Sequence, residues 1–306
     1  MRQRELPSNT WLTALTFLLA TAVVVDAQGV SRPADHALSV ALRGTAAVAV
    51  VLDVKSGQLL AVAHPQEAEQ LRSSPGSVLK PFFLAEALEA DRIRPDTTIF
   101  CRRNLRIAHR QVDCTHPASE AVFNAEQALA YSCNSYFAEL AKRFSPNEAA
   151  AALEKYGLAE QSQLHPSQIS GVLQGTGTME ATELFVLGLD GIEITARQLA
   201  TAYRELALEL RNLPSGSAIA AVKRGLEGSV QYGMAHNAQT PGISVTGKTG
   251  TASDTGQPWT HGWFAGYAPS DSPKVVIVVY LPRGNGADAA HLAQGFFNSY
   301  KETLLR

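Results

Sequence analysis

The placement of β-rich segments at both ends of the chain is the strongest constraint on its fold. One hairpin is expected near the start, around the turn Lys55-Ser56-Gly57, and three more strands follow one another near the end. The candidate strands are residues 45–53, 58–63, 243–252, 259–268 and 274–281. Together they suit one five-stranded antiparallel sheet, flanked by helices. The expected fold is α/β (α+β), with residues 77–240 inserted as a mostly helical lobe and a cleft between lobe and sheet.

Helix signals fill the middle and the end of the chain. Thr195 is a suitable N-cap for an apolar, periodic segment, and Pro146 and Gly157 stand just inside the start and just past the end of another. The expected helices cover residues 146–157, 195–211, 218–237 and 287–305. By contrast, residues 92–115 are predicted to be irregular.

The N-terminus has the layout of an export signal. Two arginines precede an apolar run over residues 11–25, and small residues follow it. Residues 1–27 are therefore predicted to be a signal peptide or a short membrane anchor that associates with the membrane through residues 11–25. Residues 28–36 form a linker, and residues 37–306 form the domain, which is expected outside the cytoplasm, in the periplasm or secreted.

Charge and cysteine content limit the classes of function. The formal net charge is -2 and no basic run occurs, so nucleic acid is not an expected partner. No histidine–cysteine group has convincing metal spacing, so neither a metal nor a cofactor is expected. In an oxidising compartment, Cys101 and Cys114 flank a polar stretch and are predicted to form a disulfide. Cys133 is left over and is expected to be a buried thiol.

A serine one helical turn before a lysine is the first candidate for chemistry. Residues three apart lie on one face of a helix, so the Lys80 amine can reach the Ser77 hydroxyl and accept its proton if the site lowers the lysine pKa. Pro81 has no N–H to give to a helical ladder, which places the helix start close to Ser77. Free backbone N–H groups at this start can stabilise an alkoxide or oxyanion.

A second candidate interrupts a helical stretch over residues 120–144. Serine and asparagine compete with the helix for backbone hydrogen bonds. The run Ser132-Cys133-Asn134-Ser135 should therefore break the helix. Ser132 and Asn134 would then lie on a short loop between two helices.

The third candidate, around Lys248, fits two different motifs. Residues 242–249 match the Walker A pattern letter for letter. A phosphate loop needs a strand before it and a helix after it, but residues 237–242 resemble a turn and residues 250–256 are poor helix formers. We therefore favour a strand, and no nucleotide is expected.

In a strand, alternate side chains share a face. Thr249 and Thr251 would lie together and could bind a substrate carboxylate, whereas Gly250 would allow a ligand close to the backbone. Lys248 would supply charge to the cleft.

In this order, the three motifs resemble the penicillin-binding protein transpeptidase family and its serine β-lactamase relatives. The flanking sequences over about residues 45–300 are also typical: Pro75-Gly76-Ser77, Lys80-Pro81-Phe82, Ala128-Leu129, Ile194-Thr195, Gln198-Leu199-Ala200 and Trp263-Phe264-Ala265-Gly266-Tyr267-Ala268-Pro269. Cys101, Cys114 and the Ser132-Cys133 step are similar to class B, elongation-type members. The chain has no room for their large N-terminal pedestal, so it looks like a bare transpeptidase module.

The resemblance implies a role for each motif. Ser77 would attack a D-Ala-D-Ala peptide or a β-lactam and form an acyl-enzyme, Lys80 would take the proton, and Ser132 with Lys248 would relay a proton to the leaving group. Asn134 would hold the substrate amide. The backbone N–H groups of Ser77 and Thr251 would form the oxyanion hole.

The carboxylate of the substrate would be bound by Thr249 and Thr251, with Gly250 beside them. His261 is interpreted as a polar residue at a strand end and not as a catalytic base.

The expected function is thus a serine D,D-transpeptidase that acts on peptidoglycan stem peptides and binds β-lactams. The alternatives are a penicillin-binding sensor or scaffold with little turnover, and a hydrolase such as a D,D-carboxypeptidase or a β-lactamase-like enzyme. Other cell-wall enzymes are possible partners.

Overall fold

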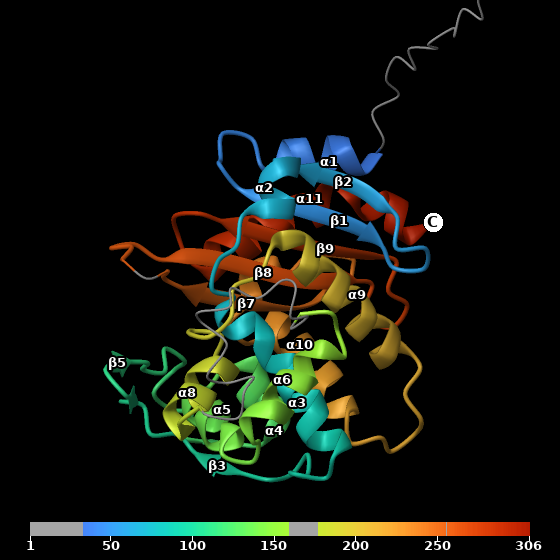
Figure 1. The fold of residues 1–306 in the computed structure, drawn as a ribbon. Helices are drawn as coiled ribbons and strands as arrows, with labels where there is room; N and C mark the ends of the chain where they lie inside the picture. Colours follow the sequence, from blue (N-terminus) through green and yellow to red (C-terminus); the bar gives the residue numbers. More distant parts are fainter. Residues whose placement is uncertain (1–32, 159–176, 255) are drawn as a thin grey trace, which may run out of the picture. The chain divides into compact units, whose positions relative to one another are not determined.

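The structure, a computed structural model, describes residues 33–158, 177–254 and 256–306 (Figure 1). They belong to a single unit, Ser31–Arg306. The predicted signal or anchor over residues 1–27 lies outside the described residues. Within the described ranges, none of the helices is both long enough and apolar enough to cross a membrane.

A five-stranded antiparallel sheet forms the centre of the described part of the chain, as predicted. Its strands are β1 (Val48–Asp53), β2 (Leu59–Ala63), β7 (Thr246–Ala252), β8 (His261–Ala268) and β9 (Val275–Leu281). The order is β2-β1-β9-β8-β7, so the last strand of the chain pairs with the first. Val50 lies opposite Val278 in this central pair. β7 is an edge strand, which leaves one side of its backbone open to the helical lobe.

The alternation of side chains in β1 explains why helices cover both faces of the sheet. Ala49 and Val51 pack in one apolar cluster with α1 (Pro33–Ala41) and α11 (Gly286–Leu305). Val50 points the other way and packs with α9 (Ala196–Arg211). In a sheet that is buried on both faces, each strand is a nearly continuous run of apolar residues, as β1 is here. Figure 1 shows α1 and α11 on the side of the sheet away from the lobe.

The predicted lobe is present and mostly helical. The helices of the lobe, together with the short helices that lie between the lobe and the sheet strands in the sequence, are α2 (Pro65–Gln70), η1 (Gly76–Leu79), α3 (Lys80–Glu89), α4 (Ala125–Ala130), α5 (Asn134–Ala141), α6 (Pro146–Glu154), α8 (Met179–Val186), α10 (Ala220–Gln231) and η2 (His236–Ala238). Short paired strands complete it: β3 (Ile99–Phe100) with β6 (Val122–Phe123), and β4 (Arg106–Ile107) with β5 (Arg110–Gln111).

Several local predictions are confirmed and a few boundaries move. Thr195 caps α9, with its hydroxyl accepting the Gln198 N–H, and the helix break at Ser132 is present between α4 and α5. The segment after Gly247 is a strand, which rules out a phosphate loop there. The linker prediction is corrected at its end, because α1 already begins at Pro33.

Candidate active site

Ser77 lies on η1, a tight turn that leads directly into α3. The Lys80 N–H donates to the Ser77 carbonyl, so the two residues are one short turn apart. Gly76 has a left-handed φ of 58°, and a Cβ at this position would lie 2.9 Å from the Thr251 carbonyl oxygen. Glycine therefore permits both the backbone conformation and the close approach of β7. The prediction that a helix begins near Ser77 is confirmed, although its first turn is a 3₁₀ helix.

Lys80 joins the first motif to the second. In the described part of the chain its Nζ donates to the Ser132 carbonyl at 2.8 Å, to Ser132 Oγ at 3.2 Å and to Asn134 Oδ1 at 2.6 Å. Ser77 Oγ is not among these partners. Burial lowers the pKa of Lys80 to about 8, against the opposing effect of the Cys114 and Cys133 sulfurs. The site thus holds a lysine that can give up its proton near neutral pH.

The Ser132 turn is strained and is held by its neighbours. Ser132 has a φ of 54°, which is uncommon for a residue with a side chain. The Asn134 amide nitrogen donates to the carbonyls of Val112 at 3.0 Å and Asp113 at 3.1 Å. Asn134 therefore links Lys80 to the segment that precedes Cys114. These side-chain contacts fix the turn together with two backbone hydrogen bonds, from the Ser132 N–H to the Leu129 carbonyl and from the Cys133 N–H to the Ala128 carbonyl.

Lys248 supplies the third motif from β7. Its side chain is fully buried, and its Nζ donates to the Thr249 carbonyl at 3.0 Å. Burial, and next the charge of Lys80, lower the pKa of Lys248 well below its usual value. Gly250 allows this strand to lie against the segment just before Ser77, since a Cβ there would lie 2.5 Å from the Pro75 carbonyl oxygen.

The two threonines share a face of β7, as predicted, and this face contacts the start of α11. Thr251 Oγ1 accepts the Gly286 N–H at 2.9 Å, which leaves its own hydroxyl hydrogen free to donate to a ligand. Thr249 is buried and donates to the Met234 carbonyl at 3.3 Å. The role of both residues in binding a carboxylate stays a prediction, and Thr251 is the more accessible of the two.

Comparison with known proteins shows the family of the chain. A family model described as "Penicillin binding protein transpeptidase domain" matches residues 47–300. The chain belongs to this family.

Two relatives are named as peptidoglycan D,D-transpeptidases. The probable enzyme PenA of Neisseria flavescens is 26% identical over 289 residues, a match that covers 80% of this chain and 71% of PenA. MrdA of Acinetobacter baumannii is 22% identical over 230 residues, which cover 58% of this chain and 34% of MrdA. The chain thus spans only part of each relative.

Solved transpeptidase domains have the same fold. The D,D-transpeptidase domain of a peptidoglycan glycosyltransferase from Eggerthella lenta matches with a TM-score of 0.73 and 21% identity, over 89% of this chain and 81% of that domain. The TP domain of penicillin-binding protein 3 from Burkholderia pseudomallei matches with a TM-score of 0.75 and 20% identity, over 89% of this chain and 94% of that domain.

In this transpeptidase domain His261 is the first residue of β8, as predicted, and it also contacts the segment before Ser77. Its side chain is buried, and its Nε2 lies 2.7 Å from the Ser74 carbonyl oxygen. Asp254 Oδ1 accepts the Ser74 N–H at 2.9 Å, and Trp263 Nε1 donates to the same Ser74 carbonyl at 3.1 Å. A histidine at a strand end gives no local signal of such a contact, because its partner is 187 residues away in the sequence.

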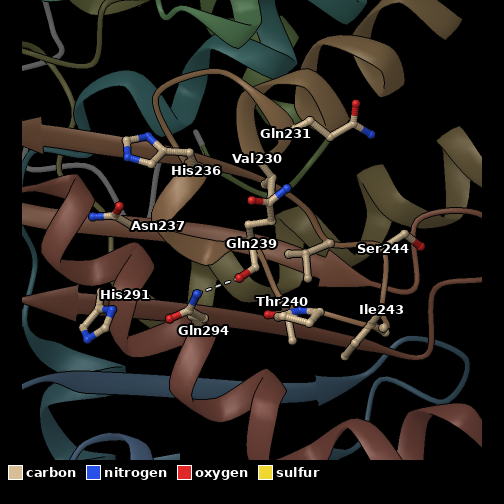
Figure 2. A pocket seen from close by; sticks show the side chains of 13 residues that line it. Val230, Gln231, His236, Asn237, Gln239, Thr240, Ile243, Ser244, His291 and Gln294 are labelled. Carbon is tan, nitrogen blue, oxygen red and sulfur yellow. Dashed lines mark hydrogen bonds between the residues drawn. The ribbon is translucent and has the colours of Figure 1, made fainter.

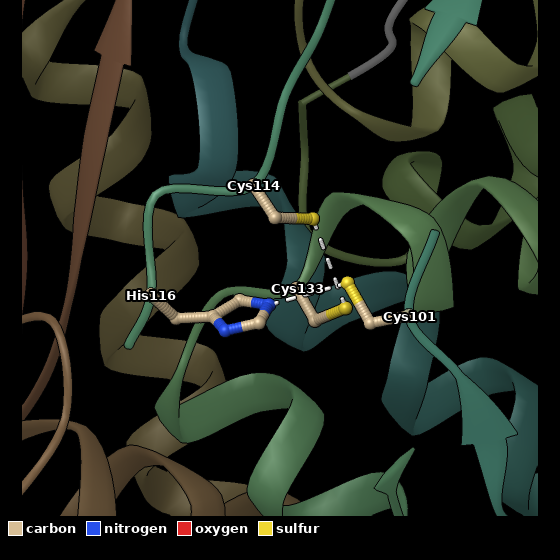
Figure 3. Close-up of side chains that lie close together, drawn as sticks. All are labelled: Cys101, Cys114, His116 and Cys133. Atoms are coloured by element: carbon tan, nitrogen blue, oxygen red, sulfur yellow. Dashed lines mark hydrogen bonds between the residues drawn. The ribbon is translucent and has the colours of Figure 1, made fainter. Parts of the chain in front are cut away.

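The predicted disulfide is not formed in the structure of this transpeptidase domain. All three cysteines are free and buried, including Cys133 as expected. Cys101, Cys114 and Cys133 instead gather around His116, and their ligand atoms lie within 4.8 Å of one another (Figure 3). These four residues could hold a metal ion. The spacing of these residues in the sequence did not reveal a metal site, because they come from three separate segments of the chain.

A cavity of about 660 Å³ lies away from the predicted catalytic residues (Figure 2). Its lining comes from the end of α10, the connection to β7 and the side of α11, and includes His236, His291 and Gln294. A smaller hollow of about 440 Å³ lies nearer the motifs, between Val112 and Asp254. The Val112 carbonyl is the one that accepts from Asn134. Hydrogen bonds thus join Lys80 to Ser132 and Asn134, whereas the larger cavity contains none of the predicted catalytic residues in its lining.

Proposed function

We propose that this chain is a penicillin-binding serine D,D-transpeptidase that acts on the D-Ala-D-Ala stem peptides of peptidoglycan. The observation that carries the proposal is the contact of Lys80 Nζ with both Ser132 and Asn134, one short turn after Ser77. This contact supports three roles: Ser77 as the nucleophile, Lys80 with its lowered pKa as the base, and the Asn134 amide as a contact for substrate. The family match and the two named relatives support the same activity.

In the first half of the reaction, Ser77 Oγ attacks the carbonyl carbon of the penultimate D-Ala, and its proton passes to neutral Lys80. The C–N bond then breaks. Ser132 passes a proton to the departing amine of the terminal D-Ala, and Lys248 replaces the proton on Ser132. The product is a Ser77 ester.

The backbone of Thr251 is well situated to stabilise the intermediate. It lies against Gly76, the residue before the nucleophile. With the Ser77 N–H at the start of η1, the Thr251 N–H would bind the oxyanion.

In the second half, the amine of another stem peptide attacks the ester and forms the cross-link. Before this attack, the proton on Lys80 passes through Ser132 to Lys248, so Lys80 is neutral again. Lys80 then takes the proton of the amine and gives it to the departing Ser77 oxygen. Water as acceptor would give carboxypeptidase activity by the same route. We propose an amine as the main acceptor because the relatives are named as transpeptidases.

Residues 1–27 are proposed to export the domain, either as a cleaved signal or as an anchor held in the membrane by residues 11–25. Other cell-wall enzymes are proposed as partners. Fractionation of cells that express the full chain, with sequencing of the mature N-terminus, distinguishes a cleaved signal from an anchor. Recovery of the chain in the cytoplasm with an intact N-terminus would contradict export.

The function is tested by labelled penicillin followed by a donor peptide with separate amine acceptors. We expect the label on Ser77 and a new peptide bond to the amine. Ser253→Ala is a matched control, since Ser253 is an exposed serine just beyond β7. A labelled Ser77 without peptide turnover would point to a sensor, and release of the terminal D-Ala without amine incorporation would point to a carboxypeptidase.

A further inference from the structure

Four soft metal-binding side chains converge in the lobe outside the residues assigned to catalysis. Cys101 Sγ lies 3.3 Å from His116 Nε2, and Cys114 Sγ lies 3.9 Å from Cys133 Sγ. All four side chains are buried, and Figure 3 shows them pointing at a common centre. Three thiols and an imidazole are a donor set of structural zinc sites.

The distances agree better with a shared ion than with a disulfide. A tetrahedral zinc ion with Zn–S bonds of about 2.3 Å holds two sulfur ligands about 3.8 Å apart. The Cys114–Cys133 distance of 3.9 Å is close to this value. A disulfide would require about 2.05 Å and would leave the third thiol over. A zinc ion uses all four side chains.

The surroundings of His116 prepare it to be a ligand. Its Nδ1 lies 3.1 Å from the Pro117 carbonyl oxygen, to which an Nδ1–H would donate. Arg103 Nη1 lies 3.3 Å from the same Nδ1. Ligation of a metal ion by Nε2, which faces Cys101 Sγ, would place the ring proton on Nδ1, where the Pro117 carbonyl can accept it. Arg103 donates to the His116 carbonyl at 2.7 Å, which further fixes the segment.

We propose that Cys101, Cys114, His116 and Cys133 bind a zinc ion, and that this ion fastens residues 101–116 to the Ser132–Asn134 turn. In the described structure the only regular elements of this segment are the two-residue strands β4 and β5. The side chains of Asn134 and Ser135 already bind it to the turn, and a metal ion would add a stronger link at the same place. Cys133 stands between the two residues that contact Lys80. The bound ion would therefore position the Ser132–Asn134 turn, although the ion itself would not contact the substrate.

The metal content of the purified full chain tests the proposal without reference to activity. We expect about one zinc per chain, and cobalt substitution should give thiolate charge-transfer absorption and a tetrahedral visible spectrum. His116→Ala should lose most of the metal. His116→Cys should keep it, because four cysteines also bind zinc. His109→Ala is the matched control, since His109 is an exposed histidine in the same segment.

A wild-type chain with neither zinc nor the cobalt spectrum would overturn the proposal, and so would a disulfide among these cysteines in exported protein. The cobalt spectrum of the wild type decides the matter even if variants fail to fold. Removal of zinc by a chelator should lower the melting temperature and slow penicillin acylation; if neither changes, the positioning role is wrong. A chain that binds zinc but is not labelled by penicillin would instead contradict the proposed function.

A separate observation concerns the backbone just before the nucleophile. Both backbone polar groups of Ser74 are held by side chains: its N–H by Asp254, which follows β7, and its carbonyl by His261 and Trp263 of β8. His261 Nδ1 also lies 3.5 Å from Asp254 Oδ2, so the two side chains support each other. We infer that Asp254 and His261 are positioning residues that set where Ser77 lies relative to Thr251.

Rescue by a conservative variant tests this second inference. His261→Gln can still donate to the Ser74 carbonyl, whereas His261→Ala cannot. Because small misplacements of a nucleophile are costly, His261→Ala should slow the acylation step by about tenfold or more with little change in the non-covalent affinity for penicillin. His261→Gln should recover most of the rate. Equal losses in both variants, or no loss in either, would overturn the inference.

Discussion

The two sides of the active site are held in different ways. On the sheet side, Lys248 and Gly250 lie in β7, whose backbone pairs in regular register with β8. On the lobe side, the turn at Ser132 lies outside any ladder, has a left-handed φ and is held by Lys80 and Asn134. The lobe side should therefore respond to the loss of single side chains. The sheet side should respond mainly to changes that disturb the backbone.

The largest expected effects are those of Ser77→Ala and Lys80→Ala. Ser77→Ala should abolish acylation, because no other residue supplies the attacking oxygen. Lys80→Ala removes the base and the contacts that hold the Ser132 turn, so we expect a loss of about 10³-fold or more. The double variant should be little worse than either single one, since nucleophile and base act together.

Second-order rate constants for acylation by a labelled penicillin measure these effects. Near-normal labelling of Lys80→Ala would contradict its role as the base. Persistent covalent labelling of Ser77→Ala would contradict the whole mechanism.

Gly250→Val tests the sheet side. Its Cβ would overlap the Pro75 carbonyl, so η1 and β7 must move apart, and we expect acylation to fall on the order of 100-fold. Gly295→Ala on α11 is a control, because its nearest contact is an alanine side-chain atom at 3.3 Å. Normal acylation by Gly250→Val would show that the close contact of β7 with η1 is not needed.

Asn134→Ala is expected to have a smaller effect on the lobe side. It removes the amide that joins Lys80 to the carbonyls of Val112 and Asp113. Unpaired polar groups cost about 1–3 kcal/mol each, so acylation should slow by roughly 10- to 100-fold and stay measurable. Complete loss of labelling would mean that Asn134 takes part in the chemistry itself, and a normal rate would remove it from the site.

The pH dependence of acylation should be the mildest effect. Lys80 must be neutral to act as a base, and its pKa is lowered to about 8. The rate should therefore rise with pH and level off above 8. Below that pH it should fall by about tenfold per unit, as the neutral fraction of the lysine does. Acylation rates measured from pH 6 to 9 would contradict this assignment if they stayed flat.

Much of the architecture could be predicted from the sequence because it depends on local patterns. The apolar runs of the sheet, the cap at Thr195 and the helix break at Ser132 all follow from neighbouring residues. The same holds for the spacing of Ser77 and Lys80 on one turn. The contact of Lys80 with Ser132 was less evident, since it joins residues 52 positions apart.

The sequence alone therefore determined the five strands of the sheet, several of the helices and the residue types of the predicted catalytic motifs. Only the tertiary structure decided how the site is held. It gathered Cys101, Cys114 and Cys133 around His116 in place of the predicted disulfide, and it placed His261 against the Ser74 carbonyl. The physical reason is that propensity and periodicity act over a few residues, whereas these contacts join segments that meet only when lobe and sheet have folded.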